Sequence, residues 1–166
     1  MSKHWKVLTG WSSIEGQWLK RRHFNAEMLA HLAEQIRKSE AGHTGELVLA
    51  IEAVMPPHEH DSYQRALEVF GRLRVWDTPL NSGVLLYLAL DQRRIEIIAD
   101  RGIQVSDQAW HEVCQHLRHA LTKQQYLSGL VEAVQRIQDL LRQGAPHDPT
   151  LSTADDNHLS NAPVLL

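Results

Sequence analysis

Short apolar runs alternate with longer stretches of helical spacing along the middle of this chain. The run at 46–54 (ELVLAIEAV) is nearly continuous in apolar residues, which is typical of a strand covered on both faces. Two further runs, at 83–90 and 94–99, are separated by the turn Asp91-Gln92-Arg93 and predict a hairpin.

The other apolar positions recur every three or four residues, which predicts amphipathic helices. Asn25 is a suitable N-cap for the first helix and Gly42 a suitable stop. A second helix should begin near Ser62, and Ser106 caps a third. Thr122-x-x-Gln125 has the form of a capping box that opens a fourth, ending before Gly144. The expected inward-facing residues, helix by helix, are Met28, Leu29, Leu32 and Ile36; Ala66, Leu67, Phe70 and Leu73; Trp110, Val113, Leu117 and Leu121; Leu127, Leu130, Val134, Ile137 and Leu141.

This order of elements predicts a three-layer α/β/α sandwich with a mixed central sheet. Because crossovers between parallel strands are right-handed, the first two strands should be parallel and the third antiparallel to them. The sandwich should occupy residues 40–144. Residues 1–39 should form an amphipathic lead-in and an N-terminal helix that pack on it. Residues 145–166 lack periodicity and predict an extended tail whose apolar end, at 164–166, is pinned on the body.

Composition narrows the possible partners and the location. The chain has 166 residues with 17 Lys plus Arg against 20 acidic residues, so its formal net charge of −3 argues against nucleic-acid binding. Cys114 is the only cysteine, so no intrachain disulfide can form. No signal-peptide h-region and no run near the roughly 20 residues of a membrane span is present, so the cytoplasm is the expected location.

The first segment carries tryptophans ahead of a basic cluster. Trp5, Trp11 and Trp18 precede Lys20-Arg21-Arg22-His23. Such a lead-in could lie on an anionic membrane surface or on a partner protein. More often, tryptophans of this kind dock on their own domain.

Polar residues should gather at one edge of the predicted sheet. The start of the first strand, the start of the second and the end of the third meet there. The residues concerned are His43, Thr44, Glu46, Asp77, Asn81, Asp100, Arg101 and Asp107. Carboxylate and amide oxygens suit calcium or magnesium, so a divalent cation is one interpretation. The alternative is turn and cap chemistry, since Asx side chains often bond to their own backbone.

Other candidates carry weaker signals. His58-Glu59-His60-Asp61 should lie in an exposed loop at the opposite sheet edge, and His116 and His119 near Cys114 have zinc-like spacing. Glu52 interrupts an apolar strand, either as a proton carrier or by reaching solvent. No P-loop, GxGxxG, nucleophile elbow or HExxH motif is present.

In this arrangement the chain resembles the TPM domain family, formerly a domain of unknown function. The resemblance covers roughly residues 40–142 and rests on HTGELVLAIE, NSGVLLYLALDQRRIEIIADRG and SDQAW in this order. The ending NHLSNAPVLL is similar to a bacterial subgroup without signal peptide or membrane anchor. The resemblance implies an α/β/α sandwich. Family members have been linked to divalent metal binding, acid-phosphatase activity and the repair or assembly of membrane protein complexes.

The resemblance also implies site residues. The family's usual Thr-Gly-Ala-Glu appears here as Thr44-Gly45-Glu46, and its usual Thr-Gly-Arg-Gly as Ala99-Asp100-Arg101-Gly102, which adds a carboxylate. Asp77, Asn81, Asp100 and Asp107 are then the expected metal or ligand residues, and no phosphatase nucleophile is assigned.

Two functions follow as hypotheses. The favoured one is a non-catalytic binding or assembly module with a protein partner and a divalent cation, calcium or magnesium. The alternative is a metal-dependent, acid-phosphatase-like hydrolase of phosphomonoesters, with His43 or Glu46 as general acid or base.

Overall fold

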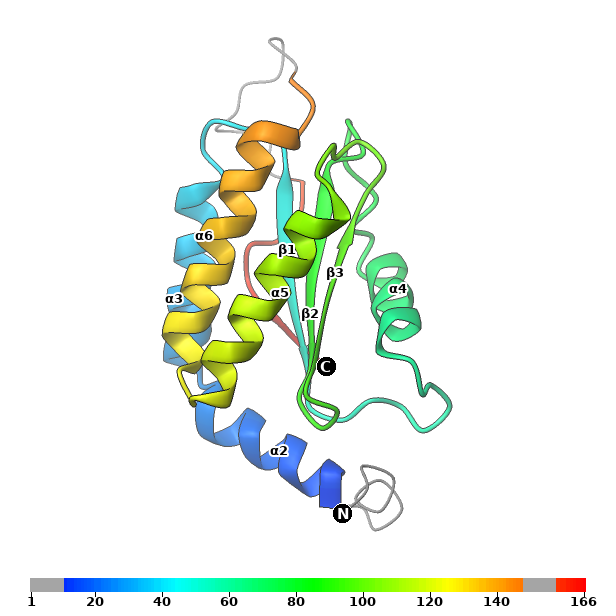
Figure 1. The fold of residues 1–166 in the computed structure, drawn as a ribbon, viewed down its shortest axis with the longest axis vertical. Helices are drawn as coiled ribbons and strands as arrows, with labels where there is room; N and C mark the ends of the chain where they lie inside the picture. The colour runs from blue at the N-terminus through cyan, green and yellow to red at the C-terminus, as the bar shows by residue number, and fades with distance from the viewer. Residues whose placement is uncertain (1–10, 148–157) are drawn as a thin grey trace.

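A mixed four-stranded sheet lies between two layers of helices. The computed structural model describes residues 11–147 and 158–166. Its helices are α2 (Trp11–His23), α3 (Ala26–Ser39), α4 (Ser62–Arg72), α5 (Asp107–Thr122) and α6 (Tyr126–Gly144). Its strands are β1 (Glu46–Glu52), β2 (Gly83–Ala89), β3 (Arg94–Ala99) and β4 (Val164–Leu165), in the order β3-β2-β1-β4. Figure 1 shows α3, α5 and α6 on one face and α4 on the other, with α2 crossing one end, so the predicted sandwich is confirmed.

The strand directions follow the prediction. β1 and β2 are parallel and in register, with Glu46 opposite Gly83. β3 returns antiparallel to β2, with Val84 opposite Ala99. The starts of β1 and β2 and the end of β3 therefore share one edge of the sheet, and the hairpin turn lies at the other end (Figure 1).

The two faces of the sheet bury separate cores. Successive side chains of a strand point to opposite faces. Leu47, Leu49 and Ile51 of β1 therefore join the core under α3, α5 and α6, whereas Val48 and Ala50 join the core under α4. This double burial explains why β1 is apolar almost throughout.

Three of the predicted helix starts are confirmed and one is wrong. α4 begins at Ser62, as predicted. The side chains of Asn25 and Ser106 accept from the backbone N–H groups of Met28 and Ala109, as N-caps do. The capping box at Thr122 does not form, because this residue ends α5 and its hydroxyl donates to the His119 carbonyl at 2.7 Å. α6 begins after Gln125 without a side-chain cap.

Two expected inward-facing residues lie at the surface. Leu67 is 38% exposed and Leu127 is 41% exposed. On α4, the buried face comprises Arg65, Ala66 and Val69. Leu67 is one residue, or roughly 100°, away from Ala66 around the helix, so it faces outward.

The C-terminal segment returns to the sheet, as the tail prediction expected. β4 pairs in parallel with β1, placing Val164 opposite Ala50, and the Leu166 N–H donates to the Ile51 carbonyl at 2.9 Å. The rest of the predicted tail at 148–157 lies outside the described residues, as does Trp5. Within the described part of the chain, no helix has the length and apolar character needed to cross a membrane.

Candidate functional site

The polar edge of the sheet is built by backbone hydrogen bonds between its three loops. The Glu46 N–H donates to the Ser82 carbonyl at 3.1 Å, and the Ser82 hydroxyl donates to the Thr44 carbonyl at 2.7 Å. The Asp100 N–H donates to the Gly83 carbonyl at 2.9 Å. These bonds hold the loop before β1, the loop before β2 and the end of β3 together.

Asn81 and Asp100 are brought to this edge by a tight approach of two backbones. Asn81 adopts the left-handed conformation, with φ of 52°, and its carbonyl accepts from the Gly102 N–H at 2.9 Å. A Cβ at Gly102 would lie 2.2 Å from the Leu80 carbonyl oxygen, so glycine is required for the approach.

Asp100 has one carboxylate oxygen in use and one without a partner. Its Oδ1 accepts from the Arg101 N–H at 2.7 Å. Its Oδ2 is buried and makes no hydrogen bond within the described structure. Asn81 Oδ1 accepts a long 3.3 Å bond from the exposed Arg101 guanidinium. A buried carboxylate oxygen without a donor requires an explanation, and a bound ion is one.

The other two expected ligands have local roles. Asp77 forms a 2.7 Å ion pair with Arg74, and both side chains are more than half exposed. Asp107 lies exposed in the first turn of α5, where a carboxylate is favoured by the helix dipole. Across residues 11–147 and 158–166, no three His, Cys, Asp or Glu side chains gather in a way that could hold a metal ion.

Glu46 anchors the C-terminal segment. It is 7% exposed, and its carboxylate accepts from the backbone N–H groups of His158, at 3.1 Å, and Leu159, at 2.6 Å. The His158 ring lies 3.1 Å from the same carboxylate. The sequence placed Glu46 at the correct edge but gave no indication of this partner, which is 112 residues away.

His43 is turned into the protein. Its Nδ1 accepts from the Gly45 N–H at 3.1 Å, and its Nε2 is buried with no hydrogen bond to any described residue. Burial lowers the pKa of His43. Gln138 lies nearby and partly opposes this effect, although its amide forms no hydrogen bond with the ring. A neutral, enclosed imidazole is poorly placed to exchange protons with a substrate.

Comparison of the sequence with models of known families identifies its family. The TPM domain model matches residues 21–140. The chain belongs to the TPM domain family. The NMR structure of the BA42 protein from the psychrophilic bacterium Bizionia argentinensis is similar, with a TM-score of 0.72 and 26% sequence identity. The similarity covers 85% of this chain and 94% of that one. A comparison with curated proteins gives no match.

Glu40 is a half-buried group of this TPM domain that the sequence did not indicate. Its carboxylate accepts from the Leu47 N–H at 3.0 Å. Burial and the adjacent Glu46 raise its pKa to about 7, although the bonds from Leu47 and Asn161 act in the opposite direction. Glu40 follows directly on α3 in a stretch that reads as a surface turn, so no local signal marked it.

Glu52 is part of a buried cluster on the α4 side of the TPM domain. It is 4% exposed, and Arg65 donates to both of its oxygens, at 2.9 and 2.7 Å. The Tyr87 hydroxyl donates to it at 2.5 Å. Burial and the neighbouring carboxylate raise the Tyr87 pKa. Glu52 therefore does not reach solvent. Strand alternation could have placed it with Ala50 on the α4 face, but not beside Arg65.

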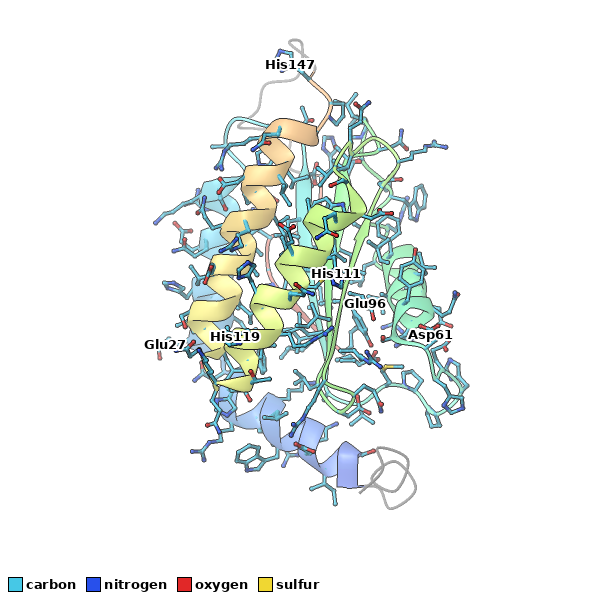
Figure 2. The ribbon with its side chains drawn as sticks, viewed as in Figure 1. Glu27, Asp61, Glu96, His111, His119 and His147 are labelled. Atoms are coloured by element: carbon cyan, nitrogen blue, oxygen red, sulfur yellow. The ribbon has the colours of Figure 1, made fainter. Side chains whose placement is uncertain are left out.

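The remaining candidates are surface or capping groups. His116 and His119 are both exposed residues of α5, and Figure 2 labels His119. Burial raises the pKa of the Cys114 thiol to about 11, so the thiolate that a metal or a substrate requires is scarce. In the 58–61 loop, Asp61 caps α4 by accepting from the Tyr63 N–H at 2.8 Å.

Proposed function

We propose that this TPM domain is a non-catalytic binding or assembly module whose polar sheet edge binds a divalent cation, calcium or magnesium. The observation that carries the non-catalytic part is the engagement of Glu46 by the C-terminal segment. Glu46 and His43 were the candidate acid–base groups, and one holds the tail while the other is enclosed. General acid–base chemistry needs a group that can reach the substrate proton, and neither is free to do so.

The cation part of the proposal is supported by Asp100 and Asn81. The Oδ2 of Asp100 is buried without a donor, and Asn81 Oδ1 accepts only a long bond from the exposed Arg101 side chain. Calcium and magnesium bind such oxygens and complete their coordination with water. In the proposed site Asp100 and Asn81 are the central ligands. Asp77 and Asp107 join them only after leaving their present local roles.

The exposed face of α2 supports a protein partner. Ile14 is 72% exposed and Trp18 is 52% exposed, close to the basic last turn of the helix. Large apolar side chains on an exposed helix next to cationic groups are typical of a contact surface.

The cation can be tested by thermal melting of chelator-treated protein with calcium, magnesium, manganese or zinc added. We expect calcium or magnesium to raise the melting temperature, because a ligand at 100 times its Kd stabilises by about 2.7 kcal/mol. Asp100→Asn should abolish this rise and Asn81→Ala should weaken it. Asp139→Asn, an exposed carboxylate on α6, is the matched control and should keep the full rise. Asp77→Asn and Asp107→Asn show whether these residues are ligands.

The alternative function, hydrolysis of phosphomonoesters, is decided by an assay with the same proteins. Hydrolysis of p-nitrophenyl phosphate is measured at acid and neutral pH with each cation. Cation-dependent turnover that Asp100→Asn removes would replace the module with a metal-dependent hydrolase. A cation-induced shift in melting temperature without turnover agrees with the module, and no shift with any cation contradicts the cation site.

A further inference from the structure

A cavity of about 410 Å³ opens at the end of the sheet opposite the polar edge. The end of β2, the hairpin turn and the start of β3 form its floor, α2 lies along one side, and the junction of α5 and α6 lies along the other. The floor residues Leu88, Leu90 and Ile95 are each at most 6% exposed. The volume is within the roughly 300–1,000 Å³ of small-molecule sites.

One wall of the cavity is aromatic. The His23 ring stacks on Tyr126 with a centroid distance of 4.1 Å and an interplanar angle of 20°. Trp18 also contacts His23, with the two rings edge-on to each other at a centroid distance of 5.9 Å. Burial and the adjacent Arg22 lower the pKa of His23, which favours the uncharged form of this planar ring at neutral pH. The wall and the floor together favour a ligand with an apolar body.

The mouth of the cavity is cationic. Arg93, Arg94 and Arg118 line it against the single carboxylate of Glu15. Arg93 forms an ion pair with Glu15. The side chains of Arg94 and Arg118 are exposed and form no ion pair or hydrogen bond with any described residue. The chain has a formal net charge of −3, so two guanidinium groups without carboxylate partners beside an apolar cavity indicate a site for an anionic group.

We propose that this cavity binds an amphipathic carboxylate, with a fatty-acid anion of medium chain length as the ligand class. The hydrocarbon chain lies on Leu88, Leu90 and Ile95 along the aromatic wall. The carboxylate lies at the mouth and accepts from Arg94 and Arg118, whose planar guanidinium groups match its two oxygens. An inorganic anion would leave the apolar floor uncovered, and an uncharged hydrocarbon would leave the arginines unused.

The site is independent of the proposed cation edge. It lies at the other end of the sheet and uses cationic and apolar groups, where the cation edge uses oxygen ligands. Failure of one proposal therefore leaves the other intact.

Isothermal titration calorimetry with monomeric dodecanoate tests the proposal on the full chain. Affinity should rise from octanoate to decanoate to dodecanoate by about four-fold for each methylene that is buried, because each contributes about 0.8 kcal/mol. Arg118→Gln and Arg94→Gln should each weaken dodecanoate binding about ten-fold through loss of a charge-assisted hydrogen bond. Arg72→Gln removes the same charge from the exposed end of α4, over the opposite face, and should leave the affinity unchanged.

Several results would overturn the proposal. These are no heat of binding up to millimolar dodecanoate, equal affinity for dodecanol, and an equal loss in the Arg72→Gln control. Co-sedimentation with phosphatidylglycerol vesicles but not phosphatidylcholine vesicles, without binding of free dodecanoate, would assign the arginines to a membrane surface instead. Melting temperatures of the three variants within the range of the unmodified chain show that any loss of affinity is local.

Discussion

At the scale of single residues, the cluster of Glu52, Arg65 and Tyr87 buries two charged side chains in the fold. Two charges are held away from water, with side-chain exposures of 8% for Arg65 and 5% for Glu52. Such a pair is stable only while both partners are present, since removing one leaves the other charge desolvated. The carboxylate of Glu52 and that of Glu68 also raise the pKa of Arg65, so the guanidinium cannot escape by losing its proton.

Glu52→Gln should therefore lower the free energy of unfolding by about 3 kcal/mol. The measurement is the urea midpoint, with the slope of the transition checked for constancy. Glu68→Gln removes the partly exposed partner of the same arginine, 2.8 Å away, and should cost less than about 1 kcal/mol. Equal losses in the two variants would contradict a role for burial in this cluster.

At the scale of elements, β1 depends on the C-terminal segment to cover its outer edge. β4 contributes only two residues, yet the Ala53 N–H and the Ile51 carbonyl also bond to Leu166, and Lys20 of α2 donates to the Leu166 carbonyl at 3.2 Å. An uncovered edge strand presents free N–H and C=O groups to another chain. The segment thus connects the sheet, the polar edge and α2.

A chain that ends after residue 157 should be less stable and should self-associate through β1. Light scattering coupled to size exclusion measures the oligomer, and amide exchange measures the protection of β1. Adding the peptide HLSNAPVLL, residues 158–166, should restore the monomer and the protection. A truncated chain that stays monomeric with unchanged exchange in β1 would show that the segment does not protect this edge.

At the scale of the whole molecule, Glu40 makes stability depend on pH. Its pKa of about 7 in the folded protein is higher than its ordinary value of 4.5. The folded state therefore binds this proton more tightly. The resulting stabilisation is fully present below pH 4.5 and is lost as the pH rises through 7. Its size is on the order of 3 kcal/mol, because one pKa unit corresponds to about 1.36 kcal/mol. His43, with its lowered pKa, acts in the opposite direction by losing stability as the pH falls.

Glu40→Gln should reduce the fall in stability between about pH 5 and about pH 8 and raise stability at the higher pH. Urea midpoints of the variant and the unmodified chain across this range give the difference, in which other titrating groups cancel. Glu27→Gln changes an exposed carboxylate in the first turn of the same helix and should leave the pH profile as it was. Parallel profiles for Glu40→Gln and the unmodified chain would rule out the Glu40 carboxyl as the cause.

Much of the fold could be predicted because it depends on local chemistry. Apolar runs gave the three main strands, and Asn25 and Ser106 cap helices as expected because caps need only neighbouring backbone groups. The errors arose where contacts with other elements determine which side chains face the core. Leu67 is apolar at near-helical spacing, but the position of α4 on the sheet turns Ala66 and Val69 inward.

The sequence by itself determined the order and direction of the strands and the edge at which Asn81 and Asp100 lie, because strand polarity and short loops leave few alternatives. Only the tertiary structure decided which of these polar groups are already engaged. Glu46 is held by His158 and Glu52 by Arg65, through contacts between segments that local periodicity cannot relate. The arginine-lined cavity likewise exists only because α2 folds back over the hairpin, which brings together residues from α2, β2, β3, α5 and α6.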